Sequence, residues 1–146
     1  MSSALTSAAA PPAIVGAVLR IDLRGFSGDL PAALGAPARD VETGEGTRSL
    51  FFDLGAQIEG MTCVEACGRL AVHLDRLFLA PATPPFADVL ARRMRLDLGF
   101  SVADKPESFT HDVPHGLLDC LGQMEAELGL TYYPCEDDSD AVIEDA

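Results

Sequence analysis

The sequence predicts an α+β fold, a two-layer sandwich in which a four-stranded, mainly antiparallel sheet carries helices on one face. Several short segments alternate between apolar and polar residues, which is typical of strands with one buried and one wet face. Two longer segments, 61–78 and 112–128, repeat apolar residues at helical spacing. Clean alternation also favours antiparallel pairing under a single helical layer, of which the ferredoxin-like arrangement is one form.

Alternation of apolar and polar residues locates the strands. The first predicted strand reads AIVGAVLRIDLR and passes from an apolar start into strict alternation, and the most regular one reads MRLDLGFSV. The four predicted strands are 13–24, 48–54, 94–102 and 130–133. Between the first two strands, the stretch 36–46 is rich in Gly, Glu and Asp and is predicted to be an exposed loop.

Capping residues and apolar stripes define the two main helices. Thr62 followed by Glu65 forms a capping box, in which two side chains satisfy N–H groups at a helix start. For the second helix, Asp112 is the predicted N-cap, Pro114 lies in the first turn, and Gly129 is the predicted left-handed stop. The apolar stripe of the first helix consists of Val64, Cys67, Ala71, Leu74 and Phe78, and that of the second consists of Leu117, Leu121, Met124 and Leu128.

The same patterns predict the domain limits and the core. Residues 13–135 are expected to form one α+β domain, preceded by a flexible segment, 1–12, and followed by a disordered acidic tail, 136–146. The predicted core residues are Leu19, Ile21, Leu50, Phe52, Leu74, Leu96, Leu98, Leu121 and Leu128.

The net charge of −13 over 146 residues narrows the classes of partner. Binding to a nucleic-acid backbone or to an anionic membrane needs basic patches, so neither is expected. The first residues form a poor signal peptide and no apolar run is long enough to span a membrane, which predicts a cytoplasmic protein. An acidic surface attracts basic proteins.

Two groups of residues are candidates for metal binding or catalysis. Cys63 and Cys67 lie one helical turn apart, but Cys67 falls on the apolar stripe, where a thiol acts as a small hydrophobic group. His111, Asp112 and His115 form a polar cluster that could ligate a metal or act in acid–base chemistry, yet Asp112 already serves as the expected helix cap. We therefore predict no enzyme activity, no cofactor, no metal and reduced thiols.

The order of segments resembles the bacterial "domain of unknown function 4279" family. The likeness rests on the opening strand AVLRIDL, the segment LGAPARDVETGEG, the strand LARRMRLDLGFSV and the ending LLDCLGQMEAELGLTYYP, and it covers about residues 13–134. The resemblance implies the same α+β fold. It also implies a bacterial protein of a kind often encoded near toxin systems as a candidate immunity protein.

The wet face of the predicted sheet is the expected binding surface. It should present Arg20, Arg24, Phe51, Arg95 and Tyr133, which combine guanidinium groups with aromatic rings. We therefore expect a non-enzymatic domain that binds a protein partner with basic character, such as an immunity-type inhibitor, and homo-oligomerisation is left open. The alternative is a regulatory domain that binds a small molecule, and the least favoured option is a metal-dependent enzyme using His111, Asp112 and His115.

Overall fold

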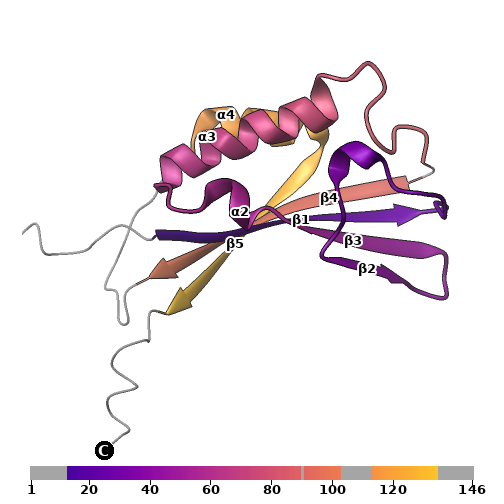
Figure 1. Cartoon of the computed structure of the whole chain (residues 1–146), viewed down its shortest axis with the longest axis horizontal. Coiled ribbons are helices and arrows are strands. Elements are labelled where there is room, and N and C mark those ends of the chain that lie inside the picture. The colour runs from indigo at the N-terminus through magenta and orange to yellow at the C-terminus, as the bar shows by residue number, and fades with distance from the viewer. Residues whose placement is uncertain (1–12, 90, 103–112, 135–146) are drawn as a thin grey trace, which may run out of the picture.

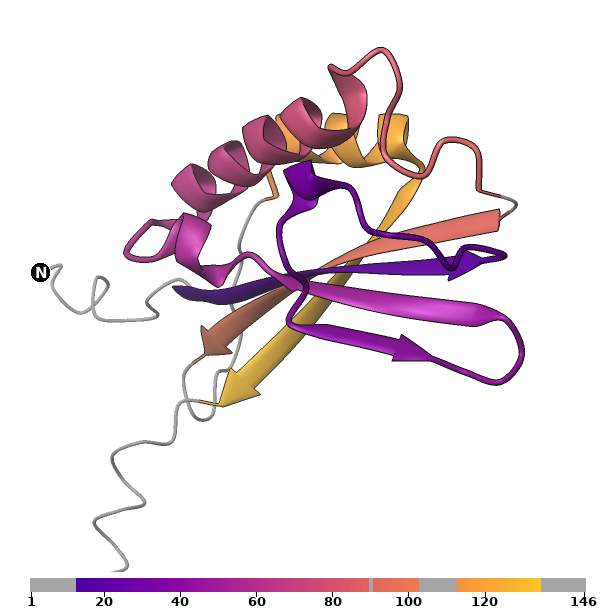
Figure 2. The same cartoon turned by 45° about the vertical axis from the view of Figure 1, so that its right-hand side comes forward.

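The computed structural model describes residues 13–89, 91–102 and 113–134 as an α+β domain with a five-stranded mixed sheet. In chain order the elements are β1 (Ala13–Arg24), η1 (Ala32–Leu34), β2 (Arg39–Glu42), β3 (Thr47–Asp53), α2 (Gly55–Ile58), α3 (Cys63–Leu74), η2 (Asp75–Leu79), β4 (Ala91–Val102), α4 (His115–Met124) and β5 (Ala126–Pro134). Figures 1 and 2 show α2, α3 and α4 on one face of the sheet, while no described element covers the other face. The predicted segment 1–12 and tail 136–146 lie outside the described residues.

The sheet has the order β2-β3-β1-β4-β5, with β1 at its centre. β1 pairs antiparallel with β3 and β4, and β2 pairs antiparallel with β3, whereas β4 and β5 run parallel. The prediction of four strands was therefore wrong by one. The ferredoxin-like arrangement was wrong as well, because that fold alternates β-α-β-β-α-β, whereas this chain forms three strands before its first α-helix.

The missed strand is β2, which lies in the predicted loop 36–46. Its residues read RDVE and are all exposed, so it has no apolar face to reveal it in the sequence. The following ETGEG segment closes a tight hairpin, in which the N–H of Thr43 donates to the carbonyl of Thr47 at 2.9 Å. Gly46 has a φ of 82°, a conformation that glycine adopts without steric cost.

The capping box predicted for α3 is confirmed. The Glu65 N–H donates to the Thr62 hydroxyl at 3.2 Å, and the Thr62 N–H donates to the Glu65 carboxylate at 3.1 Å. The buried face consists of Ala66, Cys67, Leu70 and Leu74, with Phe78 following in η2. Val64 is 61% exposed, because it lies about a quarter of a turn away from the centre of that face.

The boundary between α4 and β5 differs from the prediction. The helix ends at Met124, and Glu125 takes the left-handed conformation with a φ of 59°. Gly129 is therefore not the helix stop but lies in β5, and Leu128 belongs to that strand. The predicted N-cap Asp112 lies outside the described residues, and Pro114 occupies the N-cap position.

The core lies between the sheet and the helices, as predicted. Eight of the nine named core residues are buried, and Leu128 packs partly buried against them. The register is confirmed on β4, where Leu96 is fully buried while the side chain of its neighbour Arg95 is 45% exposed. Within the described ranges, no helix is both long and apolar enough to cross a membrane.

Candidate functional site

The five residues predicted to bind a partner lie together on the open face of the sheet, which we define as the face away from α2, α3 and α4. Arg20 and Arg24 come from β1, Phe51 from β3, Arg95 from β4 and Tyr133 from β5. In β1, β3 and β4, alternation places these residues opposite the buried apolar residues of their own strands. Tyr133 lies over Gly99, on the same face of β4 as Arg95. Four strands therefore contribute to one continuous surface.

One row of paired residues crosses all five strands of this face. Strand pairing aligns Arg39 with Phe51, Phe51 with Arg20, Arg20 with Arg95, and Arg95 with Glu127. Directly opposed residues have Cβ atoms about 5 Å apart, so neighbouring members of the row can contact each other. The row is the central feature of the open face, and we call it the arginine row.

Phe51 is held between two guanidinium groups in the arginine row. The guanidinium carbon of Arg39 lies 5.0 Å from the centre of the ring, and that of Arg20 lies 5.2 Å away. Cation–π attraction of this kind stabilises the arrangement by about 0.5–1 kcal/mol at an exposed site. Arg39 was not predicted to lie here, because its strand was interpreted as a loop.

Two Arg-x-Asp segments repeat across the centre of the open face. The Nε of Arg20 donates to Asp22 at 3.0 Å, and the Nε of Arg95 donates to Asp97 at 2.7 Å. Because β1 and β4 are antiparallel and Arg20 opposes Arg95, the two Arg–Asp pairs extend in opposite directions along the sheet. The repeat is visible in the sequence as LRIDL and MRLDL, and that signal could have identified the paired geometry.

Glu127 ends the arginine row and binds two arginines. Its carboxylate lies 3.0 Å from Arg93 Nη2 and 3.8 Å from Arg95 Nη1. The hydrogen bond to Asp97 raises the pKa of Arg95 above its usual range, and the charge of Glu127 adds to the effect. Glu127 was missed as a surface residue of the sheet because it lay inside the predicted second helix.

Two glycines form the floor beneath these side chains. A Cβ atom on Gly129 would collide with the Arg95 guanidinium and the Asp97 carboxylate, so this ion pair lies directly over the strand. A Cβ atom on Gly99 would lie 3.1 Å from Cε2 of Tyr133, so the tyrosine ring covers that glycine. Glycine here gives close approach of side chains rather than unusual backbone angles.

A shallow hollow of about 610 Å³ lies on this face between β1, β4 and β5. Its lining residues are Val18, Arg20, Asp22, Arg93, Arg95, Asp97, Glu127, Thr131 and Tyr133. The lining combines donors, acceptors and one aromatic ring, so it can contact a polar protein surface.

The charge of the open face differs from that of the whole chain. Its arginines outnumber its carboxylates by one, whereas the chain as a whole carries a net charge of −13. The arginines are Arg20, Arg24, Arg39, Arg93 and Arg95, and the carboxylates are Asp22, Asp53, Asp97 and Glu127. The excess acid therefore lies elsewhere on the chain.

The cysteines considered in the sequence lie in or beside the core. Burial, with the neighbouring Cys63, raises the pKa of Cys67 to about 12, and burial, with Asp75, raises the pKa of Cys120. No disulfide joins the described cysteines. A protonated thiol is a poor nucleophile and a poor metal ligand, so the chemistry of Cys67 and Cys120 is that of apolar packing.

The polar cluster around His115 is only partly described, because His111 and Asp112 lie outside the described ranges. His115 Nε2 lies 3.2 Å from the Asp119 carboxylate, one helical turn along α4. Among the described residues, no three His, Cys, Asp or Glu side chains are arranged to hold a metal ion.

Comparisons of the chain with family models, with curated proteins and with solved structures each found no match.

Proposed function

We propose that this chain is a non-enzymatic interaction domain of the bacterial cytoplasm that binds a protein partner through the open face of its sheet. The observation that carries the proposal is the arginine row, in which Arg39 and Arg20 flank Phe51 and Arg95 lies beside Arg20 on the next strand. The resemblance to the bacterial "domain of unknown function 4279" family belongs to the same proposal, as does a role as an immunity-type inhibitor.

The pairing of Arg20 with Arg95 favours a ligand that carries carboxylates. Like charges directly opposite each other destabilise a sheet. Arg95 is compensated by both Asp97 and Glu127, whereas Arg20 is compensated only by Asp22, through its Nε. Within the described part of the chain, the terminal nitrogens of Arg20 have no hydrogen-bond acceptor. A carboxylate of the partner would bind these nitrogens and relieve the repulsion.

Phe51 and Tyr133 supply the apolar part of the surface. Phe51 is held by two arginines, and Tyr133 is 53% exposed while its ring covers Gly99. Aromatic rings that are already held in place lose little conformational entropy on binding, which is typical of hot spots at interfaces.

The overall charge determines the kind of partner and the speed of the encounter. A chain with a net charge of −13 attracts a basic protein over a distance of about one Debye length, about 8 Å at physiological salt. The partner is thus basic overall and presents carboxylates where it touches Arg20 and Arg95. Such a division between steering charge and contact charge gives fast and specific association.

The experiment is to replace Phe51 and Tyr133 with Ala, separately and together, and to measure affinity for a purified binding partner by calorimetry. The partner is first captured from the source cells with the wild-type chain. Loss of a hot spot costs at least about 2 kcal/mol, or roughly thirtyfold in affinity. The matched control is Leu118→Ala, which removes an exposed apolar side chain from α4 on the other side of the molecule.

Two results would contradict the proposal. The first is a double variant that binds as tightly as the wild type, and the second is an equal loss of affinity in the Leu118→Ala control. A salt series separates the two roles of charge, because added salt should slow association while leaving the effect of the aromatic substitutions on dissociation unchanged.

A further inference from the structure

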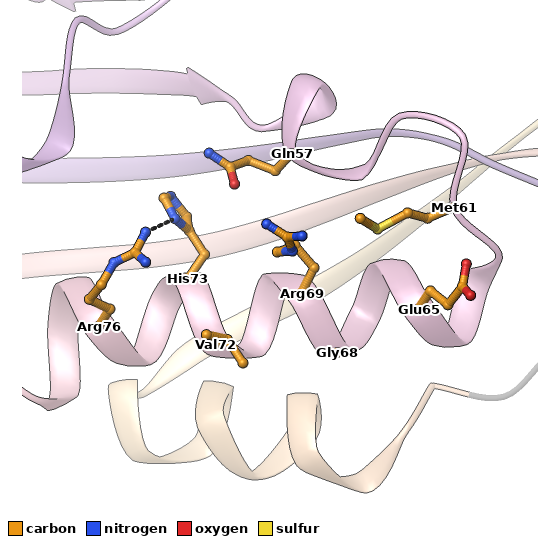
Figure 3. A pocket seen from close by; sticks show the side chains of 8 residues that line it. All are labelled: Gln57, Met61, Glu65, Gly68, Arg69, Val72, His73 and Arg76. Carbon is orange, nitrogen blue, oxygen red and sulfur yellow. Dashed lines mark hydrogen bonds between the residues drawn. The ribbon is translucent and has the colours of Figure 1, made fainter.

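A second hollow lies on the helical layer, away from the open face. It has a volume of about 550 Å³ and runs along α3 beside α2. Its lining residues are Gln57, Met61, Glu65, Gly68, Arg69, Val72, His73 and Arg76. Figure 3 shows the side chains of Gln57, Arg69 and His73 extending into the space between α2 and α3.

The polar groups in this hollow are mainly hydrogen-bond donors. Arg69, His73 and Arg76 follow one another at i, i+4 and i+7, so they lie along one side of α3 and of η2, which continues it. Within the described residues, neither Arg69 nor Arg76 forms an ion pair with a carboxylate. The amide of Gln57 faces them from α2 and adds two N–H groups.

The contact between Arg76 and His73 fixes the histidine tautomer. An arginine can only donate, so its Nη2, 3.1 Å from His73 Nδ1, donates to that nitrogen (Figure 3). The proton of the neutral imidazole is therefore on Nε2, which becomes a further donor. Burial, with the charge of Arg76, lowers the pKa of His73, which favours this neutral form.

The one carboxylate of the hollow is already bound elsewhere. Glu65 accepts the N–H of Thr62 in the capping box, one turn before Arg69. Its charge offsets one of the two arginines, so Arg69, Arg76 and Glu65 leave the hollow with a net positive charge while His73 is neutral. The hollow is thus a local cationic site with an apolar margin formed by Met61 and Val72.

We propose that this hollow binds a small organic phosphate that carries two phosphoryl groups. The backbones of Arg69 and Arg76 are about 10 Å apart along the helix axis, and their long side chains can converge so that each contacts one of two linked phosphoryl groups. Guanidinium groups bind phosphate bidentately, while the histidine Nε2–H and the Gln57 amide donate single hydrogen bonds. The organic part of the ligand then rests on Met61 and Val72. The ligand site is independent of the protein-binding face.

Pyrophosphate is the probe for this site, and its binding is followed by NMR chemical shifts and calorimetry. Arg69→Ala and Arg76→Ala should each weaken pyrophosphate binding at least about tenfold, because each removes one bidentate contact. The matched control is Arg92→Ala, which removes the same charge from an exposed residue of β4 that does not line this hollow. The affinity of the Arg92→Ala variant for pyrophosphate should stay within about twofold of that of the wild type.

Gly68 offers a second test that keeps the fold intact. It lies inside α3, and an added Cβ would meet no atom within 4 Å, so side chains are accommodated there. Gly68→Gln and Gly68→Glu both replace glycine with a better helix former, and they differ only in charge. Gly68→Glu should abolish pyrophosphate binding, whereas Gly68→Gln should retain more of it.

Three results would overturn the proposal. One is the absence of saturable pyrophosphate binding to the wild-type chain. Another is an equal loss of affinity in Arg92→Ala, which would indicate a general charge effect. The third is binding of citrate in place of pyrophosphate, which would identify a carboxylate site instead of a phosphate site.

Discussion

The two faces of the sheet use the same strands for different purposes. On β4, Leu96 is completely buried against the helical layer, while Arg95 on the other face pairs with Asp97 in contact with solvent. Apolar burial contributes about 25 cal/mol per Å², whereas an exposed ion pair contributes 0–1 kcal/mol. The covered face therefore supplies most of the stability, which leaves the open face free for the binding role proposed above. Four predictions test this division, and they run from the largest expected effect to the smallest.

Leu96→Ala should lower the free energy of unfolding by about 2–5 kcal/mol, because it opens a cavity in the core under the helices. Its neighbour on the open face provides the control, since Arg95→Ala should cost no more than about 1 kcal/mol. Urea denaturation of both variants measures the two values. Equal losses would mean that the open face contributes as much to stability as the core.

Arg48→Ala should lower the free energy of unfolding by about 1–3 kcal/mol, which is more than the loss of any ion pair on the open face would cause. Arg48 lies on the helical side of β3, and its side chain is only 13% exposed. It binds both oxygens of Asp40, at 3.0 and 2.8 Å, and donates to the Gly28 carbonyl at 2.9 Å. Its guanidinium also lies 5.5 Å from the ring centre of Phe26. Thermal denaturation beside Arg93→Ala, whose arginine side chain is 70% exposed, tests the ranking.

Gly129→Ala should cost about 1 kcal/mol or less, because the new methyl group displaces flexible side chains on the open face and no core atom. Gly129→Ala should lower the free energy of unfolding even less in a chain that already carries Arg95→Ala. A double-mutant cycle on the free energy of unfolding measures this coupling. Strict additivity of the two substitutions would show that Arg95 does not lie over Gly129.

Asp40→Asn gives the smallest effect and a defined dependence on pH. The hydrogen bond from Arg48 lowers the pKa of Asp40 below its ordinary value of 3.8. Because the folded state favours the charged carboxylate, its contribution is present above pH 3.8 and is lost as the pH falls through the lower folded value. The free energy of unfolding of the variant should be lower than that of the wild type by less than about 1 kcal/mol at pH 7, and the difference should disappear in acid. A gap that widens in acid would contradict this sign.

Helices and strands with an apolar face could be predicted from the sequence, whereas the strand without one could not. The alternation of β1 gave its bounds, Ala13–Arg24, and the pair Thr62 and Glu65 gave the start of α3. β2 was missed because a short edge strand of charged residues buries nothing. Because β2 was missed, Arg39, one of the two arginines that contact the Phe51 ring, was not placed on the open face.

The end of α4 was ambiguous for a different reason. Leu121, Met124 and Leu128 fit helical spacing, while Leu128 and Leu130 fit the alternation of a strand. Only the parallel pairing of β5 with β4, which aligns Leu128 with Leu96, decides between them. Pairing between distant segments is the information that local patterns lack, and it also brings Glu127 to the end of the arginine row.

The central position of β1 has a consequence for synthesis on the ribosome. β1 emerges first and can pair with β3 early, but its other edge waits for β4, which follows α2, α3 and η2 in the chain. A nascent chain that stops near residue 90 would expose an unpaired central strand with its row of leucines and isoleucine. Such an edge is a template for aggregation. Incomplete translation products of this chain should therefore depend on chaperones, whereas the complete chain covers the edge as soon as β4 is released.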